Sequence, residues 1–555
     1  MPNRLFIISI EKPENTGQVI DSLEEMIEKC TSGTEIYSFY RWQGTKNVKG
    51  ISINDSYGSF FRVTKILKRK LKFHSSKDFH TRSQRELIQA AMGTKQFTLI
   101  TDSLEQENGL IALLGILPNQ HGAEIEAIRI QAGTNNSAHR VATILQPQKG
   151  IHVLPAWINC GSSTTFNIIR QELSRINVMS LEILVNPYSG KKTKEILKSW
   201  QMRPTAPNQI FAINDLTAKI RFIKSFILDK RVRSSIVYSQ ATIYSAMNVP
   251  RFWKKLLMRI NPDVVYVNHY FNLPIAKRLI GKKCKPYFVL DTHDIQSVNY
   301  SDQKYQTRFT KIYNGFQEMR RSEFLFLESP DLLVFVNKHE EYLYSQSSKN
   351  LQQKTITSIP VDFKSLSENP TALDEISNYA TTQDSMIVMS NNQANQLSID
   401  WFIQKVLPFN PTFHVTIVGS IKDYVESKYD TTIKYTNLTC RGVLEDLDNE
   451  YLNHKVVLIP VLIGGGIAIK TLEAMRYKKI IISTKKGMRG ISVQESDWVQ
   501  DDPKSFATVW RDVLNDSSLQ NKFRSEVSEW ATKLQTETYA EKVFPSIVSA
   551  LSKNG

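Results

Sequence analysis

Cysteine is scarce in this chain of 555 residues. Only Cys30, Cys160, Cys284 and Cys440 are present, and no two lie close enough in sequence to form a metal-binding pair of the CxxC kind. Cysteines that are few and scattered in this way are typical of a protein that stays in a reducing compartment. We therefore expect a cytoplasmic protein.

Long apolar runs are also missing. The most apolar candidate is residues 110–118 (LIALLGILP), which is far shorter than the roughly 20 residues that a helix needs to cross a bilayer. The first residues, MPNRLFIISIEKPEN, contain an apolar run of strand length followed by charge, unlike a secretory signal. The sequence thus predicts neither a signal peptide nor a membrane span.

Two familiar nucleotide-binding loops are absent. The pattern GxGxxG does not occur, and residues 464–471 (GGGIAIKT) miss the pattern GxxxxGK[ST] because Ile469 stands where the second glycine is required. A β-branched residue there hinders the backbone from wrapping a phosphate. These absences argue against a dinucleotide-binding motif and a P-loop NTPase.

What the chain has in excess is positive charge. Lys plus Arg number 70 and Asp plus Glu 54, a net charge of +16, which favours anionic partners. Two basic amphipathic stretches, residues 62–73 (RVTKILKRKLKF) and 252–259 (FWKKLLMR), could lie on an anionic membrane or could be solvated helix faces. The basic runs lack interleaved stacking aromatics and no recognition motif is present, so we expect no nucleic-acid partner.

The order of apolar runs predicts an α/β protein. Residues 1–148 are interpreted as a small α/β accessory domain of unknown role, with residues 134–149 as a linker. Two doubly wound units follow, at 149–380 and 381–535, and residues 536–555 form a C-terminal helix or tail. The first unit opens with a strand at 151–158, a polar loop at 159–165 and a helix at 166–176, and further strands are predicted at 235–238, 263–267 and 287–291.

The most informative stretch is residues 455–490. Two β-branched runs, 455–463 and 479–484, flank a helical pattern at 467–477, which predicts a buried parallel βαβ unit. Three consecutive glycines precede the helix, so a ligand can approach main-chain N–H groups where the helix dipole favours an anion. Lys470 could add a charge and Glu473 could accept hydrogen bonds from sugar hydroxyls. The alternative is a tight turn followed by a surface ion pair of these two residues.

The segment GGGIAIKTLEAM with KKIIISTKKGMRGI resembles the donor-binding segment of retaining, group 1 glycosyltransferases of the GT-B fold. This resemblance implies that the glycine-rich loop faces the donor diphosphate, that Glu473 binds the ribose and that Arg489 contacts phosphate. The donor-binding residues are then Gly464, Gly465, Gly466, Ile467, Glu473 and Arg489. Many members carry an acidic residue eight positions before the glutamate, where this chain has Gly465.

A second resemblance lies in the preceding unit. The segment LDTHDIQSVNY is similar to the D-x-H-D segment of the same family, and residues 329–340 and 359–362 resemble later parts of its first domain. It implies that His293 and Asp294 are catalytic, together with Lys470 of the donor half. Gly161, Ser162 and His269 would line the acceptor side of the cleft. Taken alone, the His-Asp pair fits a structural role equally well.

The predicted fold is therefore two doubly wound, Rossmann-like domains facing a cleft, preceded by a small α/β domain. The predicted function is transfer of a sugar from a nucleotide-sugar donor to a saccharide or lipid-linked acceptor, in cell-surface polysaccharide synthesis at the inner face of a membrane. No cofactor and no metal are expected, since the triplet Asp446-Leu-Asp448 opens a probable helix, where acidic residues suit the dipole. An epimerase or hydrolase of the same fold, and a catalytically silent nucleotide-binding scaffold, remain as alternatives.

Overall fold

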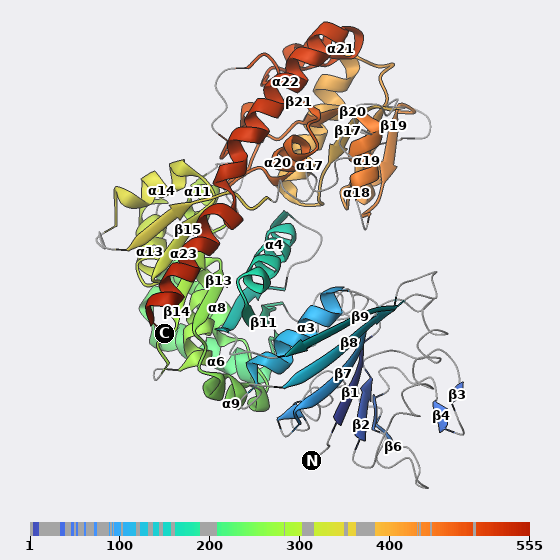
Figure 1. Ribbon diagram of the computed structural model, residues 1–555. Helices are drawn as coiled ribbons and strands as arrows, with labels where there is room; N and C mark the ends of the chain where they lie inside the picture. Colours follow the sequence, from blue (N-terminus) through green and yellow to red (C-terminus); the bar gives the residue numbers. More distant parts are fainter. Residues whose placement is uncertain are drawn as a thin grey trace.

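A computed structural model gives the fold (Figure 1). From residue 148 onward it describes residues 148–156, 161–188, 208–281, 284–301, 316–348, 353–361, 383–429, 431, 435–444, 447–491 and 496–554. Before that it describes residues 4–9, 34–38, 46–48, 51–53, 60–62, 72–74, 88, 91–92, 94–101, 104–117, 123–130 and 137–143. Among these described residues, no helix is both long and apolar enough to cross a membrane.

The N-terminal part contains a five-stranded sheet in the order β2-β1-β7-β8-β9, of which β9 alone is antiparallel to its neighbour. The strands are β1 (Arg4–Ser9), β2 (Thr34–Ser38), β7 (Gln96–Thr101), β8 (Glu124–Ile130) and β9 (Ser137–Thr143). Two small ribbons pair β3 (Lys46–Val48) with β4 (Ile51–Ile53) and β5 (Phe60–Arg62) with β6 (Lys72–His74).

Helix α3 (Leu104–Ile116) joins this part to the rest of the molecule. It packs against β7 and β8 of its own sheet and against β11 of the next sheet, as Figure 1 shows. A helix between two sheets must be apolar on several sides, which explains the run LIALLGI. The core of the N-terminal part is therefore continuous with that of the first doubly wound half.

The first half is built on a seven-stranded parallel sheet in the order β12-β11-β10-β13-β14-β15-β16. Its strands are β10 (Gln148–Pro155), β11 (Val178–Val185), β12 (Gln209–Ala212), β13 (Val264–Asn268), β14 (Tyr287–Asp291), β15 (Leu332–Phe335) and β16 (Lys354–Thr357). The helical segments are α4 (Gly161–Arg175), α6 (Leu216–Leu228), α7 (Lys230–Ser234), α8 (Ile236–Ala246), α9 (Arg251–Ile260), η2 (Tyr270–Asn272), α10 (Leu273–Ile280), α11 (Gln296–Ser301), α13 (Phe316–Leu327) and α14 (Lys338–Ser345).

The second half has a five-stranded parallel sheet in the order β19-β18-β17-β20-β21. Its strands are β17 (Gln383–Val388), β18 (Val415–Val418), β19 (Leu438–Arg441), β20 (His454–Ile459) and β21 (Ile480–Ser483). The helical segments are α17 (Gln393–Trp401), η4 (Phe402–Val406), η5 (Leu407–Phe409), α18 (Lys422–Lys428), α19 (Asp448–Asn453), α20 (Ile469–Arg476), η6 (Lys485–Met488), α21 (Pro503–Asn515), α22 (Ser517–Leu534) and η7 (Gln535–Glu537).

The last helix, α23 (Tyr539–Asn554), returns to the first half, where Figure 1 places the C-terminus beside β14. Tyr539, Val543, Phe544 and Ile547 pack with Tyr266 and other residues of the first sheet. The return passes beside the exit of the first half, because Ile359 N donates to Glu537 O at 2.8 Å and Tyr539 N donates to Ile359 O at 3.2 Å. The last described residues of the first half and the returning chain therefore lie next to each other.

The predicted fold class is confirmed: two doubly wound parallel sheets follow a smaller α/β part. Both parallel sheets have the Rossmann strand order, in which the chain reverses direction across the sheet beside the first strand. In the first half this point lies between β10 and β13, and in the second between β17 and β20. Ligands of open α/β sheets bind at the carboxyl ends of the strands at such points.

Several local predictions are wrong. The strand predicted at 235–238 is the start of α8, because a short apolar run does not by itself distinguish a strand from a buried helix. Strand β12 was not predicted, and the predicted linker at 134–149 contains β9 and the start of β10. Gly161 and Ser162, predicted in a loop, form the first turn of α4; the side chain of Ser162 lies outside the described residues.

Candidate active site between the two halves

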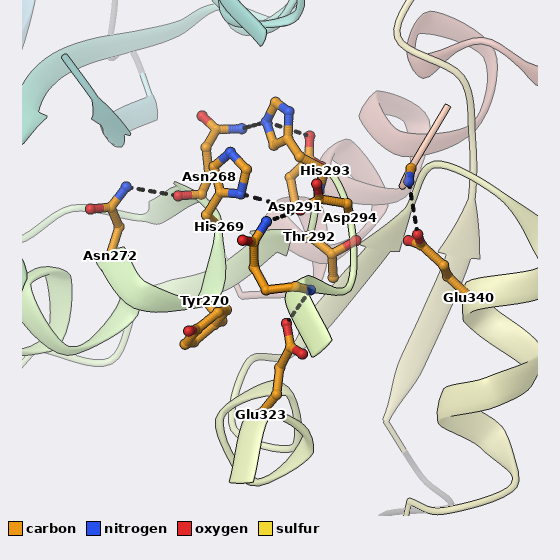
Figure 2. A network of polar contacts seen from close by, with 12 residues as sticks. Asn268, His269, Tyr270, Asn272, Asp291, Thr292, His293, Asp294, Glu323 and Glu340 are labelled. Atoms are coloured by element: carbon orange, nitrogen blue, oxygen red, sulfur yellow. Dashed lines mark hydrogen bonds and ion pairs between the residues drawn. The ribbon is translucent and has the colours of Figure 1, made fainter. Parts of the chain in front are cut away.

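Polar residues of the first half gather where β13 and β14 end (Figure 2). His269 follows β13 and His293 follows β14, and their rings stack with centroids 4.5 Å apart and planes 17° from parallel. Both residues have left-handed backbones, with φ of 64° and 55°. Such conformations cost about 1–3 kcal/mol for a residue other than glycine and cluster at functional sites.

His269 is deeply buried, and Asp294 lies at its edge. Burial, and then the neighbouring His293, hold the pKa of His269 well below its ordinary value, so its ring is neutral at pH 7. Its Nδ1 lies 3.9 Å from Asp294 Oδ1, which also accepts a hydrogen bond from the side-chain amide of Gln296. The predicted residues His269, His293 and Asp294 are thus brought together. Phe166 of α4 places its ring edge against His293, with centroids 5.3 Å apart.

A buried chain of side chains behind His293 was not predicted. Asn268 Nδ2 lies 2.7 Å from His293 Nε2, and Asn268 Oδ1 lies 2.5 Å from His152 Nε2. Since an amide nitrogen only donates, Nε2 of His293 accepts and a proton on the neutral ring belongs on Nδ1. Asn268 thus sets the ring orientation and the tautomer of His293. The sequence feature that could have indicated this network is His152, a polar residue within the apolar strand β10.

Asp291 anchors the turn that carries His293. Its Oδ1 accepts from the His293 main-chain N–H at 3.1 Å, and its Oδ2 accepts from the hydroxyls of Tyr539 at 2.7 Å and Tyr266 at 3.3 Å. Burial next to this carboxylate holds the pKa of both tyrosines well above the ordinary range, so they remain donors. The C-terminal helix therefore helps to hold the site.

The glycine-rich loop of the second half meets this cluster directly. Gly466 N donates to Glu340 Oε1 at 3.1 Å, and Gly466 O accepts from Asn337 Nδ2 at 3.2 Å, both from the start of α14 in the first half. A Cβ on Gly466 would lie 2.6 Å from His293 O, and its φ of 63° also favours glycine. Glycine at 466 lets the two halves touch.

Glu340 supplies a carboxyl group where the loop itself has none. Gly465 stands where many group 1 enzymes carry an acidic residue, and the Glu340 carboxylate reaches the adjacent Gly466 from the opposite half. Burial, and then the neighbouring Asp294, raise the pKa of Glu340 to about 8, so it is mostly protonated at neutral pH. Glu340 is the last residue of the segment 329–340 that resembles the family, but its position at the loop was not predicted.

Glu323 plays a supporting part (Figure 2). Its two carboxylate oxygens accept from the main-chain N–H groups of Gln296 and Ser297, each at 2.8 Å, at the start of α11. Burial is the main reason that its pKa is raised to about 7. Glu323 thereby fixes the short helix that follows the His293–Asp294 turn.

Lys470 and Glu473 lie on α20 just behind the glycines. Lys470 Nζ reaches Asn395 Oδ1 at 3.4 Å, and Glu473 Oε2 accepts from the Tyr451 hydroxyl at 3.4 Å; both hydrogen bonds are long. Burial, and then the nearby Arg489, lower the pKa of Lys470 to about 7, and burial raises that of Glu473 to about 7. These side chains have weak internal partners, which suits groups that bind a ligand.

Arg489 holds the loop rather than pointing away from it. Its Nε donates to Gly465 O at 2.8 Å, and its guanidinium carbon lies 3.1 Å from the position of a Cβ on Gly464. Ile467 is buried and packs against Gly490. The cation of Arg489 therefore lies at the loop, with the three glycines between β20 and α20.

The remaining predictions concern metals and membranes. Among the described residues, no group of three or more His, Cys, Asp or Glu side chains could hold a metal ion, and Asp446 lies outside them. The stretch 252–259 lies in α9, whose Trp253, Leu256 and Leu257 are buried, so this apolar face is not available to a bilayer. Of the stretch 62–73, only the ends in β5 and β6 are described.

The fold and the site together define a GT-B protein, in which a glycine-rich loop of one Rossmann-like half faces a polar cluster of the other. Residues 384–516 match the family described as "Glycosyl transferases group 1", and the second half is a domain of that family. The resemblance drawn from residues 464–490 is thereby confirmed.

Comparisons with individual proteins are more distant. A curated relative, "Uncharacterized 44.6 kDa protein in cps region" of Klebsiella pneumoniae, is 25% identical over 164 residues, which are 28% of this chain and 42% of that protein. HepE of Anabaena, solved with UDP and glucose, is 12% identical at a TM-score of 0.45, covering 73% of this chain and 100% of that one. Sucrose-phosphate synthase of Thermosynechococcus elongatus is 11% identical at 0.48, covering 73% and 98%.

Proposed function

We propose that this protein transfers a sugar from a nucleotide-sugar donor to a saccharide or lipid-linked acceptor. The observation that carries the proposal is the placement of Lys470 and Glu473 behind a triple-glycine loop, at the switch point of a group 1 glycosyltransferase domain. A curated relative described as lying in a "cps region" supports a role in cell-surface polysaccharide synthesis.

In this proposal the second half binds the donor. The glycine-rich loop cradles the diphosphate, and Glu473 accepts hydrogen bonds from the ribose hydroxyls. As the bond between the anomeric carbon and the diphosphate breaks, negative charge grows on the leaving group. Lys470 and Arg489 are already oriented beside the loop, so they can stabilise this charge without reorganisation and without a metal.

The first half would receive the acceptor. His293 and Asp294 come within contact of the glycine-rich loop, because a Cβ on Gly466 would lie 3.2 Å from Asp294 Cβ. They are therefore placed to contact the donor sugar or the incoming hydroxyl. Excluding water from the space between the halves favours transfer over hydrolysis. Retention of anomeric configuration is implied by the family alone.

The first test is calorimetric binding of UDP, GDP and their common sugar conjugates to the intact protein and to Glu473→Ala. Loss of hydrogen bonds to a charged acceptor is expected to weaken binding by roughly 1.5–3 kcal/mol, about ten- to a hundredfold. Glu473→Gln is the matched control, since it keeps the shape and removes the charge. Failure of the folded protein to bind any nucleotide would favour the scaffold alternative.

The epimerase or hydrolase alternative requires a second measurement. Release of nucleotide from the donor is followed with and without saccharide or lipid-linked acceptors. A transferase releases nucleotide in proportion to the product formed on the acceptor. Rapid donor consumption that no acceptor accelerates, with free or rearranged sugar as the product, would favour the alternative instead.

A further inference from the structure

Helix α6 presents an apolar stripe to solvent. Leu216, Ile220, Ile223 and Ile227 follow one another at helical spacing, and 73%, 57%, 55% and 64% of their surfaces are exposed. A surface helix normally shows the reverse pattern, with its apolar stripe facing the core. Half of the 14 exposed large apolar side chains among the described residues lie between residues 213 and 228: Ile213, Leu216, Ile220, Ile223, Phe226, Ile227 and Leu228.

The rotation of α6 about its axis is set by polar contacts on its inner side. Asp215 caps the helix by accepting from Ala218 N at 2.8 Å, and it also accepts from Asn248 Nδ2 at 2.6 Å. Arg221 donates to Ala246 O at 2.9 Å and to Asn248 at 3.2 Å. These bonds hold Ala218 and Arg221 toward α8, so the apolar stripe must face outward.

The surroundings of the stripe are basic. Lys219 and Lys224 are exposed on α6, and Lys230, Arg231 and Arg233 follow on α7. Residues 216–234 contain six cations and one carboxylate, Asp229, whose oxygens accept from the Arg231 main chain and guanidinium. We call this apolar and basic surface the α6 surface. It is defined by Leu216, Ile220, Ile223 and Ile227 with Lys219 and Lys224.

We propose that the α6 surface docks on an anionic lipid bilayer. Its apolar side chains would enter the boundary between head groups and acyl chains, while the lysines contact lipid phosphates. Charge complementarity favours this occupant. A second copy of the chain, itself carrying +16, would place like-charged stripes against each other in a two-fold contact, and a nucleic acid would leave the isoleucines in water.

The position of α6 fits an enzyme that serves a membrane. It follows β12, the edge strand of the first sheet, and only three residues separate its start from the carboxyl end of that strand. His269 and His293 lie beyond the carboxyl ends of strands in the same parallel sheet, so the start of α6 lies at the same edge of the sheet as the polar cluster. The docking proposal does not depend on the proposed transferase activity.

The test is sedimentation of the full-length protein with vesicles of phosphatidylcholine, with and without an equal part of phosphatidylglycerol. The wild type is expected to bind the anionic vesicles and to lose binding in high salt, which screens the lysines. Lys219→Gln with Lys224→Gln should weaken binding roughly thirtyfold, because each cation contributes about a factor of five at an anionic surface. Ile223→Ser with Ile227→Ser should weaken it by about a hundredfold or more.

Matched controls use residues of the same type elsewhere. Lys504→Gln with Lys533→Gln removes two exposed lysines of the second half, and Leu325→Ser with Val548→Ser removes two exposed apolar side chains. Neither pair should alter vesicle binding, and all variants should melt as the wild type does. Absence of vesicle binding by the wild type would overturn the proposal. So would a dimer in sedimentation velocity that Ile223→Ser with Ile227→Ser converts to a monomer, since a second copy would then occupy the surface.

Discussion

The two doubly wound halves share a strand order but treat their polar residues differently. In the first half, His152, Asn268, His293 and Asp291 bond to one another or to tyrosine hydroxyls, mostly at 2.5–3.3 Å. In the second half, Lys470 and Glu473 have hydrogen bonds of 3.4 Å, and burial shifts both pKa values to about 7. The four residues of the first half are thus held by side-chain hydrogen bonds of ordinary length, whereas Lys470 and Glu473 have only long ones.

From this difference we expect the two halves to have separate roles in the proposed reaction. A network of ordinary-length hydrogen bonds holds its side chains in one geometry, which suits the orientation of a reacting hydroxyl or sugar. In the proposed function, Lys470 and Glu473, which are half-buried and have weak partners, would gain most from binding a diphosphate and a ribose. Changes in the first half should therefore alter turnover, and changes in the second should alter both donor binding and turnover.

The largest effect is expected for Lys470→Gln. Removing a fixed donor that stabilises a developing negative charge typically lowers kcat by about 10²–10³-fold. Initial rates of sugar transfer, at saturating donor, measure this change. Lys470→Arg keeps the charge and should retain more of the rate. A Lys470→Gln enzyme with unchanged kcat would mean that Lys470 does not act on the leaving group.

A smaller effect, confined to turnover, is expected for Asn268→Leu. The substitution keeps the branched arrangement of the side-chain heavy atoms but releases the ring of His293, and a misplaced reacting group costs about ten- to a hundredfold in rate. Nucleotide affinity, measured by calorimetry, should stay as in the wild type. Asn410→Leu is the matched control, because Asn410 is an equally buried amide, bonded to Ala507 O at 2.7 Å in the second half. Equal losses of affinity and rate in Asn268→Leu would contradict the division of work.

The mildest test is the pH dependence of donor binding. Above pH 7 Lys470 loses its proton and with it its attraction for the diphosphate; below pH 7 Glu473 gains a proton and accepts fewer hydrogen bonds. Affinity for a nucleotide sugar should therefore be highest near pH 7 and fall by at most about tenfold per pH unit on either side. Calorimetry between pH 5.5 and 8.5 checks this expectation.

Two variants separate the alkaline and the acidic side of this dependence of affinity on pH. Lys470→Arg should remove the alkaline fall, because guanidinium stays charged throughout the range. Glu473→Gln should remove the acidic fall and lower the plateau. A wild-type affinity that is flat between pH 5.5 and 8.5 would show that these groups do not titrate in the free protein.

The glycine-rich loop and its neighbours in the second half could be predicted from the sequence because they are local. The loop, Lys470 and Glu473 lie within one βαβ unit, so their spacing and the family-like pattern place them together. The same holds for the strand that ends before His293 and Asp294. The two sheets were predictable as well, since buried parallel strands are continuous apolar runs.

The rest depends on contacts between distant parts of the chain. Glu340 and Gly466 are 126 residues apart, and Asp291 and Tyr539 are 248 apart. No spacing rule connects such pairs, so the carboxylate at the loop and the anchoring tyrosine were missed. The exposed stripe of α6 was missed for a different reason: its periodicity matches a core-facing helix, and only the packed structure shows which way the stripe faces.

The hydrogen bonds between the end of the first half and the returning chain have a mechanical consequence. The chain leaves the first half beyond Val361 and returns at Tyr539, and the two passages are joined by hydrogen bonds between Ile359 and residues 537 and 539. The end of the first half and the returning chain are thus bonded to each other at one place, so we expect the halves to rotate about this place rather than slide. The distance between Gly466 and Glu340 then reports the opening angle, so a single pair of labels on the loop and on α14 would follow the whole movement.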